Sequence, residues 1–299
     1  MATKKTSTTK KSKAKSNNLS KKSKKSETNK ESRIISAKSF SLKVSSYTEQ
    51  TRILQILSVP IYVGLAIAVW FQMASTTFPI TLSHQAKNIL ASSNSTEFTP
   101  AFHVIYDIQL RYCVIVTLII MTSFAALSAL KMPKVYAQAV SKKVNPWRWI
   151  TVGIVGSILV NITSLLNGLS DIIAIKVSSL IILTAAVVAW QVERQHTVNS
   201  KAPKITAPLA IFLALLSMAS IVAAMVGTYF FGLIRSPWYV YASTAVLLLA
   251  TVNIILNQVM YIKGKKNWKD YSFIDRNAQI TVFIAVIAIS IVLISGLAK

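Results

Sequence analysis

Seven long runs of apolar residues alternate with shorter polar segments along this chain. Each run reaches the ~20 residues that an α-helix needs to cross the ~30 Å hydrocarbon core of a bilayer. Because the runs lack the alternation of a barrel strand, helices are the only spanning structure that satisfies their backbone groups. The pattern predicts transmembrane helices at residues 53–76, 105–130, 149–170, 172–192, 207–232, 238–262 and 278–298.

The composition supports the same class of protein. Hydrophobic residues make up 53% of the 299 residues and charged residues 14%, against about 25% charged residues in soluble domains. Cys113 is the single cysteine, so an intrachain disulfide is excluded, and the three histidines are too scattered for metal-ligand spacing. We therefore expect an all-α, rhodopsin-like bundle of seven transmembrane helices without a metal site.

The amino-terminal segment differs from the rest of the chain. Residues 1–43 hold fourteen Lys and Arg residues against two Glu residues, and large apolar side chains are rare before residue 33. Such a segment buries too little surface to offset its ordering entropy, so we predict a disordered tail at 1–45 and a membrane domain at 46–299. The tail could be a solvated topology signal or could bind anionic lipid. Nucleic acid is the least favoured partner, since the interleaved aromatic residues of single-strand binders are missing.

Basic residues in the loops predict the orientation. They concentrate in the tail and in the loops after the second, fourth and sixth spans, whereas the opposite loops hold only Lys87, Lys176 and Arg235. Because cytoplasmic loops carry the excess of Lys and Arg, we expect a multi-pass protein of the cell membrane with a cytoplasmic amino terminus and Lys299 outside. The basic residues of the three inner loops are Lys131, Lys134, Lys142, Lys143, Arg148, Arg194, Lys201, Lys204, Lys263, Lys265, Lys266, Lys269 and Arg276.

Polar residues recur at helical spacing inside two spans. Ser157, Asn161 and Ser164 share one face of the third span, and Asn253 and Asn257 share a face of the sixth. Polar groups in hydrocarbon point into the bundle or a water-filled cavity. Two interpretations stay open: hydrogen bonds between helices, and a polar pocket for a small ligand.

Charged and aromatic residues near the span ends have structural interpretations. Asp107 and Arg111 are four residues apart and predict an ion pair on the second span. Asp171 and Lys176 frame the short turn after the third span and are expected at the interface. The six tryptophans lie near predicted span ends, as in an interfacial belt. Catalytic constellations and carboxylates at mid-membrane depth are missing, so we expect neither an enzyme nor a proton pump.

Several segments resemble the heliorhodopsins, seven-helix retinal proteins with a cytoplasmic amino terminus. Asn145-Pro146-Trp147-Arg148-Trp149 is similar to the entry into the family's third helix, and Gly168-Leu169-Ser170-Asp171-Ile172 is similar to its end. Further similarity covers Glu193, Pro237–Tyr241, Asn253, Asn257 and the run from Trp268 to Arg276. The resemblance extends over residues 50–299, and it implies the fold and a tendency to form homodimers.

Two positions depart from the family pattern. Counting from Trp268, the Schiff-base lysine of the family falls at Val286, and the run from Ile280 to Ala298 contains no lysine. Counting from Arg148, the counterion glutamate falls at Thr151. A protonated Schiff base is a buried cation that needs a carboxylate nearby, so the two losses are physically linked. We therefore expect no covalent retinal and no other cofactor, and we count Thr151 with the possible polar pocket.

The resemblance without its pigment site leaves two hypotheses for function. The first is a non-enzymatic membrane protein that acts in sensing, in ligand binding or as a scaffold for a partner. The alternative is a transporter or channel for small solutes that uses the polar faces of the third and sixth spans.

Overall fold

The computed structural model describes residues 49–87, 98–131, 133–199, 205–232, 235–264, 268 and 270–298. The predicted basic tail at 1–45 lies outside these residues, and so does Lys299.

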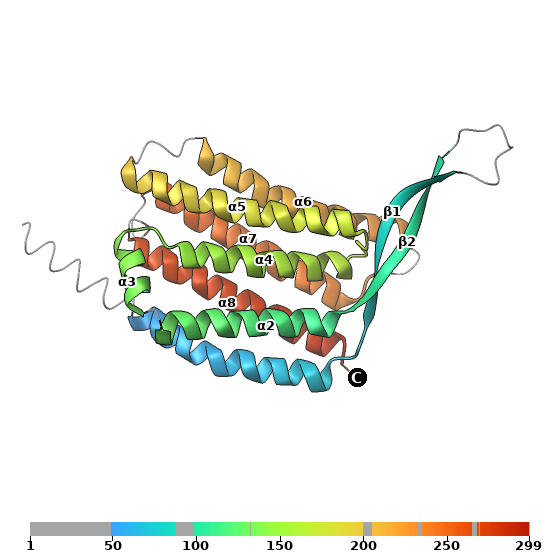
Figure 1. Ribbon diagram of the computed structural model, residues 1–299, viewed down its shortest axis with the longest axis horizontal. Helices are drawn as coiled ribbons and strands as arrows, with labels where there is room; N and C mark the ends of the chain where they lie inside the picture. Colours follow the sequence, from blue (N-terminus) through green and yellow to red (C-terminus); the bar gives the residue numbers. More distant parts are fainter. Residues whose placement is uncertain are drawn as a thin grey trace, which may run out of the picture. The chain divides into compact units, whose positions relative to one another are not determined.

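Seven helices that are long and apolar enough to cross a membrane occur in the described part of the chain, which confirms the predicted bundle (Figure 1). A short helix, α3 (Pro133–Ser141), connects the second and third of them. The seven are the first helix (Glu49–Gln72), α2 (Leu110–Ala126) with its π-helical extension η1 (Leu127–Lys131), α4 (Pro146–Leu166), α5 (Ile172–Val198), α6 (Thr206–Phe231), α7 (Trp238–Lys263) and α8 (Tyr271–Gly296).

Side-chain caps set the beginnings of α4 and α8. The Asn145 side chain accepts a hydrogen bond from the backbone N–H of Arg148 (3.4 Å), and Pro146 occupies the first helical position. Asp270 caps α8 through a similar bond. These helices therefore begin at Pro146 and Tyr271, earlier than the predicted starts at 149 and 278. Hydropathy placed the starts too late because the first turns of both helices contain polar residues.

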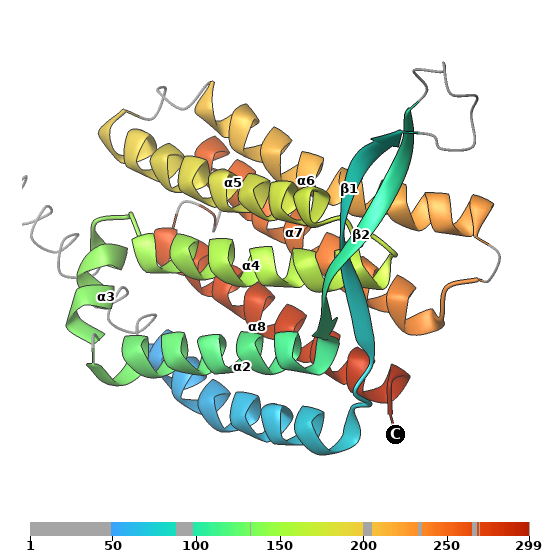
Figure 2. The same ribbon diagram turned by 45° about the vertical axis from the view of Figure 1, so that its right-hand side comes forward.

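The central helix of the bundle is α4. It contacts α2, α5, α6, α7 and α8. Of its apolar 18-residue stretch 61% is buried, against 17% for the corresponding stretch of the first helix. Gly153 permits the close approach of α5, since a Cβ atom at this position would lie 3.2 Å from the Cβ of Ala186. Figure 2 shows α4 between α2 and α5. A side chain on α4 can therefore reach most of the other helices.

An antiparallel hairpin precedes α2 and consists of β1 (Thr77–Lys87) and β2 (Phe98–Gln109). It extends past one end of the helices, and α3 lies at the opposite end (Figures 1 and 2). We call these the hairpin end and the α3 end. The sequence prediction treated 77–104 as a loop and began the second span at 105. Residues 105–109 are apolar enough to extend a hydropathy window, but they belong to a strand.

Asp171 joins the hairpin to the turn between α4 and α5. One carboxylate oxygen caps α5 by accepting hydrogen bonds from the N–H groups of Ile173 (2.8 Å) and Ala174 (3.0 Å). The other accepts hydrogen bonds from the hydroxyl and the N–H of Ser83. These bonds, that of the Ser83 hydroxyl first, lower the pKa of Asp171 to about 2. The Asp171 carboxylate therefore both caps α5 and holds β1 of the hairpin through Ser83.

The predicted ion pair of Asp107 and Arg111 on one helix is wrong. Asp107 lies on β2, whereas Arg111 lies in the first turn of α2, so helical spacing does not relate them. The Arg111 Nε donates a hydrogen bond to Gln109 (3.0 Å), and the guanidinium lies over the rings of Trp70 (5.3 Å) and Tyr112 (5.0 Å).

Candidate functional site

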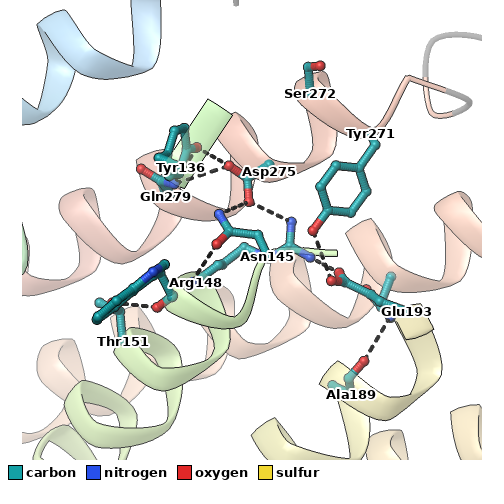
Figure 3. A network of polar contacts seen from close by, with 12 residues as sticks. Tyr136, Asn145, Arg148, Thr151, Ala189, Glu193, Tyr271, Ser272, Asp275 and Gln279 are labelled. Atoms are coloured by element: carbon teal, nitrogen blue, oxygen red, sulfur yellow. Dashed lines mark hydrogen bonds and ion pairs between the residues drawn. The ribbon is translucent and has the colours of Figure 1, made fainter. Parts of the chain in front are cut away.

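Arg148 of α4 is buried between two carboxylates at the α3 end of the bundle (Figure 3). Its guanidinium forms ion pairs with Glu193 of α5 and, at 3.2 Å, with Asp275 of α8. All three residues are at most 3% exposed. Buried charges are stable only when they are paired and hydrogen-bonded, and loss of one partner is strongly destabilising. We call these three residues the charge cluster.

Neutral donors complete the charge cluster. Asp275 accepts hydrogen bonds from the hydroxyl of Tyr136 on α3 and from the side-chain amide of Asn145 (2.9 Å). Glu193 accepts a hydrogen bond from the hydroxyl of Tyr271 (2.9 Å). Burial, and then the negative charge of Asp275, raises the pKa of Tyr136 well above its usual value, so this phenol stays a donor. One polar network therefore ties α3, α4, α5 and α8 together.

The charge cluster could not be predicted from hydropathy. Arg148 falls among the loop cations and Asp275 in the segment before the last predicted helix, because a hydropathy window excludes charged residues from a span. The N-cap residues were the available signals. Asn145, followed by Pro146, marks a helix start that places Arg148 inside α4, and Asp270 marks one that places Asp275 inside α8.

A cavity of about 60 Å³ lies beside the charge cluster, between the first helix, α2, α3, α4 and α8. The Gln279 amide donates a hydrogen bond to the Tyr136 hydroxyl (2.8 Å) and accepts one from Gln55 (2.9 Å). Thr151 lies in the wall, and its hydroxyl donates to the backbone carbonyl of Trp147 (2.9 Å). We call this space the polar cavity; its polar wall consists of Gln55, Ser58, Ser128, Tyr136, Arg148, Thr151 and Gln279.

A second cavity, of about 100 Å³, is lined by α4, α5, α6, α7 and α8. Val152 and Val282 line both cavities and therefore separate them. An engineered apolar cavity of comparable size, about 150 Å³, stays dry and accepts benzene. We call this space the apolar cavity; small residues make up much of its wall, namely Gly156, Ala185, Ala186, Ala189, Ala210, Ala214, Ala250 and Ala285.

The structure does not gather the predicted polar residues into one pocket. On α4, the Ser157 hydroxyl donates to the carbonyl oxygens of Gly153 (2.7 Å) and of Ser179 on α5 (3.0 Å). The Asn161 side chain accepts a hydrogen bond from the Ser179 hydroxyl. Ser164 is fully buried and has no hydrogen-bond partner among the described residues. This face of α4 therefore attaches to α5.

The two asparagines of α7 bond to α8 instead. The Asn253 amide donates to the Thr281 hydroxyl (2.8 Å), and the Asn257 oxygen accepts from the Asn277 amide (2.6 Å). These contacts and those of Ser157 and Asn161 support the simpler of the two interpretations, hydrogen bonding between helices.

Val286 lies in the apolar core and is 1% exposed. The neighbouring residues of α8 that line the apolar cavity are Val282 and Ala285. From Tyr271 to Gly296 the helix contains no lysine. The face of α8 toward this cavity is therefore apolar and offers no primary amine.

Trp149 does not belong to the predicted interfacial belt. Trp70 and Trp238 are about half exposed, as the belt requires, but Trp149 is 6% exposed. The guanidinium of Arg148 lies 5.0 Å from the Trp149 ring centroid, and the side chain lines the apolar cavity. Trp149 thus connects the charge cluster to the apolar cavity.

The family model described as heliorhodopsin matches residues 51–295, which is most of the chain and all seven helices apart from a few end residues. No match was found among the curated proteins.

Proposed function

Because this chain belongs to the heliorhodopsin family, a family of membrane rhodopsins, we propose that it is a non-enzymatic, multi-pass membrane protein that binds a small apolar ligand without a covalent bond. The observation that carries the proposal is the apolar cavity of about 100 Å³ among α4–α8. Its wall is mostly apolar, with Thr251 and Gln258 as polar members, and it contains no amine that could form an imine with the ligand. Binding of the ligand would be the signal that the protein senses, or it would be required before a partner protein can bind.

A retinal linked through a Schiff base does not fit the residues of this chain. The linkage needs a primary amine inside the bundle, and the protonated imine needs a carboxylate beside it. The family resemblance places Val286 and Thr151 at these two positions. Glu193 and Asp275 do not substitute for the lost counterion, because both are already paired with Arg148.

A ligand in the apolar cavity could affect the rest of the bundle through its walls. Val152 and Val282 lie between this cavity and the polar cavity, on α4 and α8. The same two helices supply Arg148 and Asp275 to the charge cluster. A ligand that presses on these valines would therefore act on the two helices that the cluster joins.

The test is ligand-dependent thermal stability of the purified protein in lipid nanodiscs. Cumene, a small aromatic hydrocarbon, should raise the unfolding temperature, since a ligand that binds only the folded state stabilises it by mass action. Ala214→Leu, which fills the apolar cavity, should abolish the shift. Ala219→Leu is the matched control, because Ala219 is exposed on the same helix. Equal shifts in both variants, or none in the native protein, would refute the proposal.

The transporter or channel alternative draws less support. Its polar faces would have to line a path, but Ser157 and Asn161 bond to α5, and Asn253 and Asn257 bond to α8. A flux assay with Asn161→Leu and Asn253→Leu would still detect transport, because these changes would then reduce flux rather than only stability.

We also propose that the α3 end faces the cytoplasm. Exposed Lys134, Lys142 and Lys143 lie at this end, whereas Lys176 and Arg235 lie toward the hairpin end. The positive-inside rule then supports a cytoplasmic amino terminus. Labelling of a Lys142→Cys variant with a membrane-impermeant thiol reagent should require permeabilised cells; labelling of intact cells would contradict this orientation.

A further inference from the structure

A water-sized pocket of about 10 Å³ between α4, α7 and α8 is lined by three residues that each carry an unpaired buried donor. The donors are the indole N–H of Trp149, the Nε of Arg148 and the side-chain Nδ2 of Asn257, and none has a hydrogen-bond acceptor among the described residues. Their residues are 6%, 3% and 2% exposed. Most buried polar groups are satisfied, so three unpaired donors on residues that line one space favour a molecule that supplies an acceptor there. We call this space the donor pocket.

The donor pocket adjoins the apolar cavity. Both are lined by Trp149, Val152, Ile254 and Gln258. A molecule whose body fills the apolar cavity can therefore place one polar atom among the donors. The volume of the donor pocket limits that atom to about the size of a water oxygen.

We propose that the ligand of this site is a hydrocarbon that carries one neutral carbonyl oxygen, an aldehyde or a ketone, which the donor pocket binds. This inference rests on the proposed function, because it assumes that the apolar cavity holds the body of the ligand. An indole N–H and an Arg Nε can only donate. A carbonyl oxygen only accepts, so it matches them without introducing a donor that would itself need a partner.

The charge cluster argues against an anionic ligand. Arg148 is already paired with both Glu193 and Asp275, so a carboxylate in the donor pocket would be a third anion around one guanidinium. Bringing an unpaired charge into this interior is unfavourable. The site therefore selects a neutral oxygen over both a carboxylate and a purely apolar group of equal shape.

Three probes of nearly equal shape test this selection: acetophenone, cumene and benzoate. In the native protein acetophenone should bind about tenfold more tightly than cumene, the size of one or two net hydrogen bonds, and benzoate should not bind. Tight binding of cumene without a preference for acetophenone would overturn the inference and leave the proposed function intact. Absence of binding by every probe would overturn both.

A matched pair of variants locates the recognition. Trp149→Phe removes the indole donor and keeps an aromatic ring, so the preference for acetophenone should fall roughly fivefold while cumene affinity is retained. Trp190→Phe is the control, since its buried N–H also lacks a partner among the described residues but the side chain lines neither space. The infrared carbonyl band of ¹³C-labelled acetophenone should shift to lower frequency on binding. A band unshifted in the native protein, or shifted equally in Trp149→Phe, would refute the role of the donor pocket.

Discussion

Single residues decide the interior chemistry of this bundle, and Arg148 is the clearest case. Its guanidinium contacts two carboxylates and the faces of two aromatic rings, those of Trp149 (5.0 Å) and Tyr271 (5.3 Å). A planar guanidinium can make these contacts together, whereas a lysine ammonium cannot. The role of Arg148 is therefore to hold α4, α5 and α8 at the α3 end.

Replacing Arg148 with methionine should destabilise the protein by about 3–5 kcal/mol, because Glu193 and Asp275 would be left buried without a cation. Thermal unfolding in detergent would measure the change. Arg194→Met is the control: Arg194 is exposed and lies over the Trp190 ring at 5.7 Å, so little stability should be lost. Adding Glu193→Gln to Arg148→Met should recover part of the loss. Equal unfolding temperatures for the two arginine variants would show that the cluster is not a stabilising unit.

At the scale of elements, the glycines show where the helices touch. A Cβ atom on Gly296, at the end of α8, would lie 2.4–2.5 Å from atoms of Tyr239 at the start of α7. A Cβ atom on Gly64 would meet nothing within 4 Å. The same substitution should therefore have opposite effects at the two positions.

Gly296→Ala should lower stability by about 1–3 kcal/mol, because α7 and α8 must separate. Gly64→Ala should raise it by up to about 1 kcal/mol through helix propensity alone. Denaturant or thermal unfolding of the two variants in one detergent would measure both. A stabilising Gly296→Ala would mean that the ends of α7 and α8 are not packed as described.

The hairpin depends on Asp171 in a pH-dependent manner. Because the folded pKa of about 2 lies below the ordinary value of 3.8, the carboxylate stabilises the attachment above pH 4. That contribution is lost as the pH falls from about 4 toward 2. Hydrogen exchange of the Ser83 amide should therefore accelerate over this interval, after correction for intrinsic rates.

Asp171→Ala should accelerate the exchange of the Ser83 amide roughly tenfold already at neutral pH, the effect expected for one lost cap interaction. The exchange rate in Asp171→Asn should fall between those of the native protein and Asp171→Ala, since asparagine keeps an acceptor oxygen but loses the charge. Unchanged protection in Asp171→Ala would show that the hairpin is held by other contacts.

The sequence predicted the elements well where hydropathy alone decides them. All seven spans were found, with the largest error at the start of α8, because its first two turns, Tyr271–Asn277, contain several polar residues and resemble a loop. The hairpin was not predicted, since the apolar residues of β2 run directly into α2. The ends of helices and strands depend on caps and pairing partners, which a hydropathy average does not detect.

The candidate site was less predictable for the same physical reason. Thr151 and Val286 could be located only through the family resemblance, and their places in the wall of the polar cavity and in the apolar core depend on the packing of helices far apart in the chain. Asn257 was singled out from its spacing, but its unpaired amide depends on where Asn277 lies. Pairing of this kind is a property of the folded bundle.

The whole molecule separates a polar interior from an apolar one. The charge cluster and the polar cavity lie toward the α3 end, and Val152 and Val282 divide them from the apolar cavity. In a pigmented relative a Schiff base would need its amine and its counterion together inside the bundle. The family resemblance places Val286 and Thr151 at these two positions, and we propose that the interior holds a ligand without a covalent bond.

The most direct test of this account is the absorption spectrum of the purified protein after incubation with all-trans retinal, followed by borohydride reduction. We predict no visible band that reduction attaches to the chain; any retinal that binds should wash away with its spectrum close to that of the free aldehyde. A red-shifted band that reduction fixes to a lysine would contradict the account, because it would place a reactive amine inside the bundle.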